Sequence, residues 1–227
     1  VLLFSFISIG LTGNSGKQLA STNVFINLSC SAFLINIGPK IDVIIHIIII
    51  GNIVATASFI YAALSFQAGN QATALAHVAW GGATILFAGL FDMIDGRLAR
   101  LGNMSTTFGA MWDSVLDRYS ELISLFGVVL IFLLNGDFWL GVVSFTAMIG
   151  SIMVSYVRAR AEGLNIECKV GIMQRPERVV VLALTAIITG ITSNLQWLAG
   201  GMILIAILAN FTAFWRVAHC YKALQGK

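Results

Sequence analysis

Long apolar stretches separated by short polar links make up most of this 227-residue chain. Six of the stretches are long enough to cross the roughly 30 Å hydrocarbon core of a bilayer as helices, which rise about 1.5 Å per residue. They cover residues 41–66, 74–96, 107–134, 138–162, 176–193 and 196–218. Runs rich in Ile, Leu, Val, Ala and Phe, with only two prolines, favour helices over the alternating strands of an outer-membrane barrel. The pattern predicts an all-α integral membrane protein with six transmembrane helices.

The first 38 residues differ from the rest of the chain. They hold one short apolar run and a mixed segment of Ser, Asn, Phe and Ile, which is too polar to span a bilayer. Such a segment is typical of a helix that lies in the membrane interface. We therefore expect an N-terminal interfacial segment at 1–38 and one six-helix domain at 39–227.

Composition supports a membrane protein and gives no support to two kinds of site. The chain is 58% hydrophobic and only 10% charged, with a mean hydropathy of +0.91. Soluble domains carry about 25% charged residues. The three cysteines are widely spaced and form no CxxC motif, so neither a disulfide framework nor a zinc site is indicated.

The basic residues predict the orientation in the membrane. Lys and Arg are retained on the cytoplasmic side of membrane proteins. All 13 lie before the first stretch, around the second and fourth links, or near the C-terminus, and the links at 67–73, 135–137 and 194–195 contain none. We expect both termini and the basic links to be cytoplasmic in a cell inner membrane. The net charge of +3 then gives a basic rim suited to anionic lipids or phosphate substrates, and we expect no nucleic-acid partner.

Four aspartates in the second and third stretches carry the candidate chemistry: Asp92, Asp95, Asp113 and Asp117. A carboxylate deep in a bilayer costs about 2.5–3.5 kcal/mol, so four need compensation. Spacings of i, i+3 and i, i+4 place each pair on one helix face, and a short link can bring the two faces together. Oxygen ligands without Cys or His favour Mg²⁺, Mn²⁺ or Ca²⁺. Two such ions about 3.5–4 Å apart can clamp phosphoryl oxygens during an in-line displacement.

Other interpretations of these acids stay open at this point. A single Asp near a helix end is usually an interfacial or capping residue. Buried acids also occur in cation or proton transporters, but the chain shows no inverted repeat or broken helix at mid-membrane. A non-catalytic membrane scaffold is a third alternative.

The aspartates belong to a longer motif. The segment from Asp92 through Asp95-Gly96-Arg97-Leu-Ala99-Arg100, followed by Gly109, Asp113 and Asp117, resembles the pattern D-x2-D-G-x2-A-R-x8-G-x3-D-x3-D of the CDP-alcohol phosphotransferase family. Every fixed position matches. The resemblance implies a CDP-linked donor, a hydroxyl acceptor, release of CMP, two divalent cations (Mg²⁺ or Mn²⁺) and a homodimer.

The resemblance also implies roles for the residues of the motif. Asp92, Asp95, Asp113 and Asp117 would ligate the metals, and Asp117 would act as general base. The small residues Gly96, Ala99 and Gly109 would let the nucleotide approach the backbone. Arg100 would bind the pyrophosphate. The donor site would thus consist of Asp92, Asp95, Gly96, Ala99, Arg100, Gly109 and Asp113.

A second cluster of charged residues surrounds the fourth link. Tyr156-Val-Arg158-Ala-Arg160-Ala-Glu162 and Arg175-Pro-Glu-Arg178 resemble segments of the bacterial phosphatidylinositol-phosphate synthases. That resemblance implies that Arg158, Arg178 and Arg216 hold the phosphate of inositol 1-phosphate, with CDP-diacylglycerol as the donor. Arg158 stands where that branch has lysine, and arginine keeps the charge but not the shape. Glycerol 3-phosphate therefore remains the alternative acceptor.

Overall fold

The computed structural model describes residues 41–101 and 107–225, and for residues 41–49 and 91–101 it describes only the backbone. Every regular element in these two ranges is an α-helix. The helices are α3 (Ile41–Gln67), α4 (Gln71–Leu101), α5 (Thr107–Leu134), α6 (Phe138–Glu162), α7 (Arg175–Thr192) and α8 (Gln196–Gln225). The all-α prediction is confirmed, and each predicted stretch coincides with one helix. The predicted interfacial segment at 1–38 lies outside the described residues.

Four helices of the described part are long and apolar enough to cross a bilayer by length and composition. The qualifying segments are Ile50–Gln67, Gln71–Leu90, Phe138–Glu162 and Gln196–Gln225. The two helices that do not qualify, α5 and α7, carry charged side chains in their N-terminal halves. The same two helices supply the ion pairs of the candidate site, which accounts for the difference from the six predicted spans.

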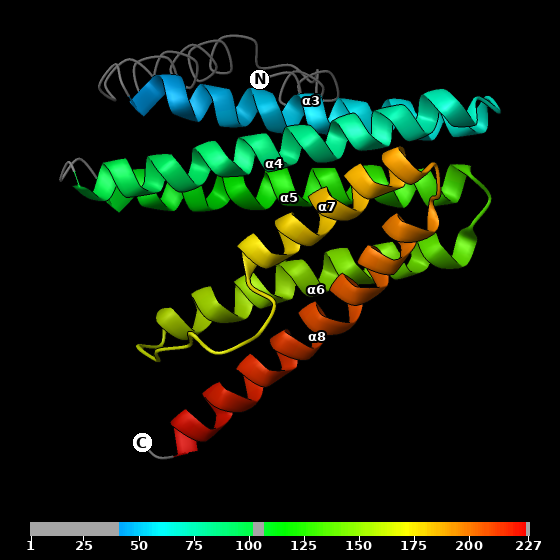
Figure 1. Cartoon of the computed structure of the whole chain (residues 1–227). Coiled ribbons are helices and arrows are strands. Elements are labelled where there is room, and N and C mark those ends of the chain that lie inside the picture. Colours follow the sequence, from blue (N-terminus) through cyan, green and yellow to red (C-terminus); the bar gives the residue numbers. More distant parts are fainter. Residues whose placement is uncertain (1–40, 102–106, 226–227) are drawn as a thin grey trace, which may run out of the picture. The chain divides into compact units, whose positions relative to one another are not determined.

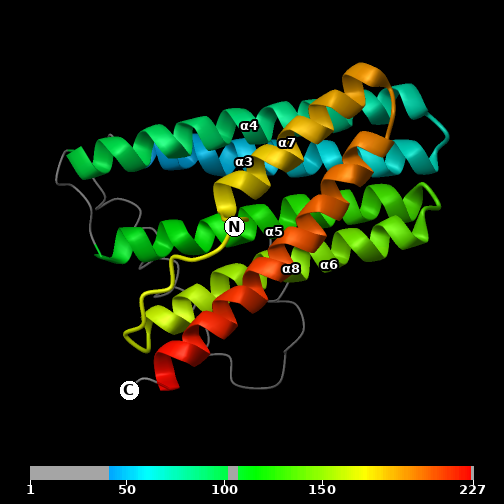
Figure 2. The same ribbon diagram turned by 60° about the horizontal axis from the view of Figure 1, so that its bottom comes forward.

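Residues 44–227 form one compact unit, in which one aromatic side chain of α3 contacts both α4 and α5. Phe59 of α3 is fully buried. A side chain at Gly81 of α4 would come within 2.6 Å of its ring, and one at Gly127 of α5 within 2.8 Å of its Cβ atom. The three helices run side by side in both views (Figures 1 and 2). Glycine is therefore needed at both contacts so that the helices can approach the ring.

Small residues also bring α4 and α7 together, and Figure 2 shows α7 crossing α4 at an angle. A Cβ atom at Gly82 of α4 would lie 2.7 Å from the carbonyl oxygen of Ala183 and from the Cβ atom of Ala186 on α7. A Cβ atom at Gly190 of α7 would likewise collide with the Cβ atom of Ala79 on α4. Close backbone approach through small residues is the usual mode of helix packing in membranes.

The link between α6 and α7, residues 163–174, is held against α8. The Met173 amide donates a hydrogen bond to the Thr212 hydroxyl oxygen (3.2 Å), and Arg216 Nε donates one to the Val170 carbonyl oxygen (2.8 Å). Gly171 adopts φ +123°, and a Cβ atom added there would collide with the Thr212 methyl group. This backbone conformation favours glycine. The link therefore delivers the start of α7 at a defined position relative to α8.

Candidate active site at the charged ends of α4, α5 and α7

The aspartate motif divides between two neighbouring helices. The backbone of α4 includes Asp92, Asp95, Gly96, Ala99 and Arg100, whose side chains lie outside the described part of the structure. Gly109, Asp113 and Asp117 lie in the first half of α5. Within the residues whose side chains are described, no group of three or more His, Cys, Asp or Glu is close enough to hold a metal ion. The predicted four-carboxylate cluster is therefore untested by this structure.

The acidic residues of α5 continue beyond the motif. Asp113, Asp117 and Glu121 follow each other at i, i+4 and i+8, so they share one helix face. Their burial increases along the helix. Asp113 is exposed, whereas the side chain of Asp117 is 12% exposed and that of Glu121 is 7% exposed. The carboxylates thus lead from the surface of the bundle into its interior.

Asp117 meets a guanidinium from α7. Its Oδ2 atom lies 2.6 Å from Nη1 of Arg175. Arg175 is the first residue of α7, where Pro176 favours the start of a helix. An arginine at a helix N-terminus is unfavourable, because this end of the helix dipole is positive. The carboxylate of Asp117 offsets that cost, and the pair fixes the beginning of α7 beside the predicted general base.

Glu121 meets the second arginine of the same helix. Arg178 donates from Nε to Glu121 Oε1 (2.6 Å) and from Nη2 to Oε2 (3.0 Å), so the pair is bidentate. A third hydrogen bond runs from Arg178 Nη1 to the Met173 carbonyl oxygen (3.1 Å). The Arg178 side chain is 2% exposed. These contacts make a second ion pair between α5 and α7, one helical turn from the first.

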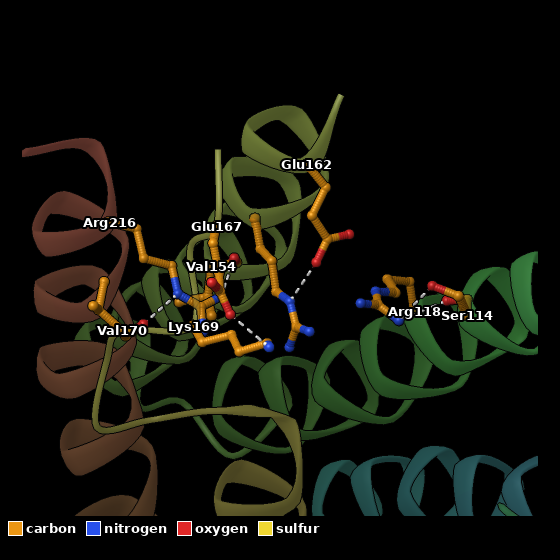
Figure 3. Close-up of polar contacts among 9 residues, drawn as sticks. Ser114, Arg118, Val154, Glu162, Glu167, Lys169, Val170 and Arg216 are labelled. Atoms are coloured by element: carbon orange, nitrogen blue, oxygen red, sulfur yellow. Dashed lines mark hydrogen bonds and ion pairs between the residues drawn. The ribbon is translucent and has the colours of Figure 1, made fainter. Parts of the chain in front are cut away.

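The other two arginines predicted to bind the acceptor have different surroundings. Arg216 of α8 is buried and donates from Nε to Val170 and from Nη1 to the Val154 carbonyl oxygen (2.6 Å), so it joins α8 to α6 and to the link (Figure 3). Arg158 of α6 is half-exposed and pairs with Glu162 at 2.9 Å. The positive charges of Arg158 and Arg178 both act on Arg216. The fold therefore brings the three arginines near enough for their charges to interact, with Arg158 and Arg178 each paired to a glutamate.

A further basic residue of this region does not reach the acidic face of α5. Arg118 Nη1 donates to the Ser114 carbonyl oxygen (2.8 Å) and to the Ser114 hydroxyl oxygen (3.0 Å), one turn back on the same helix. Figure 3 shows its side chain lying along α5. Arg118 therefore offers its charge at the surface of α5, away from the Asp117 and Glu121 pairs.

Sequence reasoning assigns no role to Glu121 and no partner to Arg175. The signal that could have found Glu121 is the i+4 spacing, which continues from Asp113 and Asp117 by one more turn. The pairing itself could not be predicted, because Glu121 and Arg178 are 57 positions apart in the chain. The three arginines predicted to hold the acceptor phosphate each have an internal partner in the structure, which the sequence did not indicate.

Two titratable groups in the α6–α7 link have shifted pKa values. A hydrogen bond from Lys169 (2.7 Å) and the charge of that lysine lower the pKa of the exposed Glu167 carboxyl group. Burial raises the pKa of the Cys168 thiol, and the neighbouring Cys220 thiol adds to the effect. Cys168 is thus a buried thiol that stays protonated near neutral pH.

Comparison with known proteins identifies relatives over most of the chain. A family model described as CDP-alcohol phosphatidyltransferase matches residues 43–215. The chain is 35% identical over 145 residues to an archaetidylinositol phosphate synthase of Methanothermobacter thermautotrophicus, covering 64% of this chain and 71% of that protein. It is 33% identical over 177 residues to a phosphatidylinositol phosphate synthase of Mycobacteroides abscessus, covering 77% and 76%.

Solved structures give the same result for the fold. The crystal structure of Mycobacterium tuberculosis phosphatidylinositol phosphate synthase with CDP-DAG bound matches with a TM-score of 0.65 and 26% identity, covering 85% of this chain and 92% of that one. A structure of that synthase in complex with manganese and citrate matches with a TM-score of 0.62, covering 77% and 82%.

Proposed function

Because the chain belongs to the CDP-alcohol phosphatidyltransferase family, we propose that it transfers a phosphatidyl group from CDP-diacylglycerol to a hydroxyl group of a phosphorylated polyol and releases CMP. Inositol 1-phosphate is the first choice of acceptor. The observation that carries this choice is the proximity of the Arg158, Arg178 and Arg216 charges, with Arg178 paired to the acidic face of α5. The relatives named as inositol phosphate lipid synthases support it.

The donor set fits divalent cations. Carboxylates without nearby His or Cys favour Mg²⁺ or Mn²⁺. Asp117 already attracts a cationic group in the described structure, since Arg175 lies 2.6 Å from it. We assign two divalent cations to Asp92, Asp95, Asp113 and Asp117. When bound, the cations would neutralise charge on the phosphoryl oxygens during transfer.

The residues of the chain then divide the work. Asp117 takes the proton of the acceptor hydroxyl group, whose oxygen forms a bond to the β-phosphorus of the donor while the bond from that phosphorus to CMP breaks. Arg100 binds the pyrophosphate, with the small residues Gly96, Ala99 and Gly109 beside the nucleotide.

The phosphate of the acceptor needs positive charge that is separate from the aspartates. A phosphate monoester carries about two negative charges near neutral pH, which four neighbouring carboxylates would repel. Arg158, Arg178 and Arg216 supply that charge. Glycerol 3-phosphate, also a phosphate monoester, is the alternative acceptor, because Arg158 stands where lysine is expected. Free inositol or serine would leave the arginines without a ligand.

The proposal extends to the placement of the protein. All six helices would span the inner membrane, with both termini and the active site on the cytoplasmic side. The ion pairs of α5 with α7 make this feasible for the two charged helices, because Asp117 and Glu121 neutralise Arg175 and Arg178 inside the bundle. A homodimer is proposed from the family alone.

The test is CMP release by the purified full chain with CDP-diacylglycerol and Mg²⁺ or Mn²⁺. Inositol 1-phosphate, glycerol 3-phosphate, serine and inositol are compared as acceptors. We expect release with inositol 1-phosphate, loss of release with a chelator and recovery when the metal is restored. Release with serine or inositol alone would contradict the phosphorylated acceptor. No metal-dependent release with any of the four would contradict the proposal as a whole.

A further inference from the structure

We propose that Glu121 is a positioning residue of the acceptor site, which holds the Arg178 guanidinium in the orientation that binds the acceptor phosphate. The inference rests on the proposed function. It adds a residue that lies outside the aspartate motif and that touches neither nucleotide nor metal in that proposal.

The geometry of the pair is specific. Both oxygens of Glu121 accept hydrogen bonds from Arg178, at 2.6 and 3.0 Å, and the Met173 carbonyl oxygen accepts a third at 3.1 Å. Two contacts to one carboxylate and one contact to the backbone prevent the guanidinium from rotating. Of its five N–H groups, three are thereby engaged and two remain for a ligand.

Stability alone does not explain such a pair. Both side chains are at least nine-tenths buried. Removing two charges from water costs about as much as their attraction returns, and apolar residues of similar size often stabilise a protein equally well. Arg178 also lies in the first turn of α7, where the helix dipole opposes a positive charge. These unfavourable terms are better explained if the fixed orientation of the Arg178 guanidinium serves to bind a phosphate.

The surroundings of the pair are polar on one side. A cavity of about 30 Å³ borders Glu121 and Arg178 and is also lined by Asn52, Ser120 and Ser124. The Ser124 hydroxyl group is 3% exposed and has no hydrogen-bond partner in the described structure. A cavity of this size holds one or two water molecules. Water in this cavity can therefore accept hydrogen bonds from the Arg178 N–H groups that do not donate to Glu121 or Met173.

The pair is also placed in register with the predicted base. Glu121 is one turn from Asp117 on α5, and Arg178 is one turn from Arg175 on α7. The two ion pairs therefore join the two helices at successive turns. An acceptor phosphate bound by Arg178 would consequently be held at a constant distance from Asp117. Loss of the Glu121 carboxylate frees the Arg178 guanidinium to rotate, which weakens its binding of the acceptor phosphate.

The experiment compares Glu121→Gln with wild type in the CMP-release assay and uses Glu167→Gln as the matched control, because Glu167 is an exposed glutamate paired with Lys169. We expect Glu121→Gln to raise the KM for inositol 1-phosphate by about tenfold to a hundredfold. The KM for CDP-diacylglycerol and the kcat at saturating acceptor should change much less. Glu121→Asp should recover part of the acceptor KM. A thermal melt verifies that each variant is folded. If Glu121→Gln does not fold, Glu121→Asp is compared with wild type instead.

A second readout does not depend on turnover. Inositol 1-phosphate should raise the melting temperature of wild type and of Glu167→Gln, and the shift should be much smaller for Glu121→Gln. An unchanged acceptor KM, or equal increases in the donor and acceptor KM values, would overturn the positioning role even if wild type releases CMP as proposed. If wild type releases no CMP with any acceptor, the proposed function fails; absence of a melting shift for wild type would then overturn the positioning role too.

Discussion

Nη1 of Arg175 lies 2.6 Å from Oδ2 of Asp117, so the first residue of α7 is paired with the predicted general base on α5. Both side chains are largely buried, at 24% and 12% exposure. This pair connects α7 directly to a helix that carries the aspartate motif. It also places a positive charge at the carboxylate to which the acceptor proton is assigned.

The first prediction concerns Asp117 itself. Asp117→Asn keeps the size of the side chain and an oxygen that can accept a hydrogen bond from Arg175, but it removes the base. We expect CMP release to fall by about 10²–10⁴-fold. The melting temperature should fall as well, because Arg175 loses its charged partner, but the protein should remain folded. Binding of CDP-diacylglycerol, measured separately, should be largely retained. Turnover near the wild-type rate would show that another group takes the proton.

Replacement of Arg178 should affect stability as well as binding. Arg178→Met leaves Glu121 as a buried unpaired carboxylate, which costs about 3–5 kcal/mol. The double variant Glu121→Leu/Arg178→Met removes both charges and should recover most of that loss. Thermal or denaturant unfolding in detergent measures the coupling. If the free-energy change of the double variant equals the sum of the changes for Glu121→Leu and Arg178→Met, the pair does not form in solution.

The close approach of α4 and α7 gives a third prediction. A side chain at Gly190 would collide with Ala79 and lie 3.0 Å from the Leu75 carbonyl oxygen. We expect Gly190→Leu to destabilise the protein by about 1–3 kcal/mol. Gly200→Leu is the matched control, because no atom lies within 4 Å of the position its Cβ would take. Equal melting temperatures for the two variants would contradict the packing described for α4 and α7.

The fourth prediction concerns the thiol of Cys168. Its pKa is raised by burial, so the thiolate that reacts with iodoacetamide forms at higher pH than it does for an exposed cysteine. The folded state holds this proton more tightly than the unfolded chain does. The corresponding contribution to stability is therefore complete below the ordinary thiol pKa and is lost as the pH rises through the raised value.

Mass spectrometry after alkylation of the native protein measures this effect. We expect little modification of Cys168 near pH 8, and full modification after unfolding at the same pH. Cys168→Ser identifies the modified site. Rapid labelling of Cys168 in the native protein near neutral pH would contradict both its burial and the direction of the shift.

Much of the fold could be predicted from the sequence because its signals are local. The stretches 107–134 and 138–162 coincide with α5 and α6 at both ends, since polar and glycine-containing links interrupt the apolar runs there. The end of α8 was less predictable. The helix continues to Gln225, past the apolar stretch that ends at 218, because polar residues can extend a helix beyond the bilayer.

The sequence by itself determined the helical class, the order of the helices and the family, because hydrophobic runs and the spacing of the aspartate motif can be recognised without knowledge of neighbours in space. Only the tertiary structure decided which charges meet. Asp117 with Arg175, and Glu121 with Arg178, are each joined across 57 or more positions. Such pairing depends on where the α6–α7 link places the start of α7, and that position follows from the contacts of Met173 and Val170 with α8. These contacts are long-range, so no local pattern in the chain encodes them.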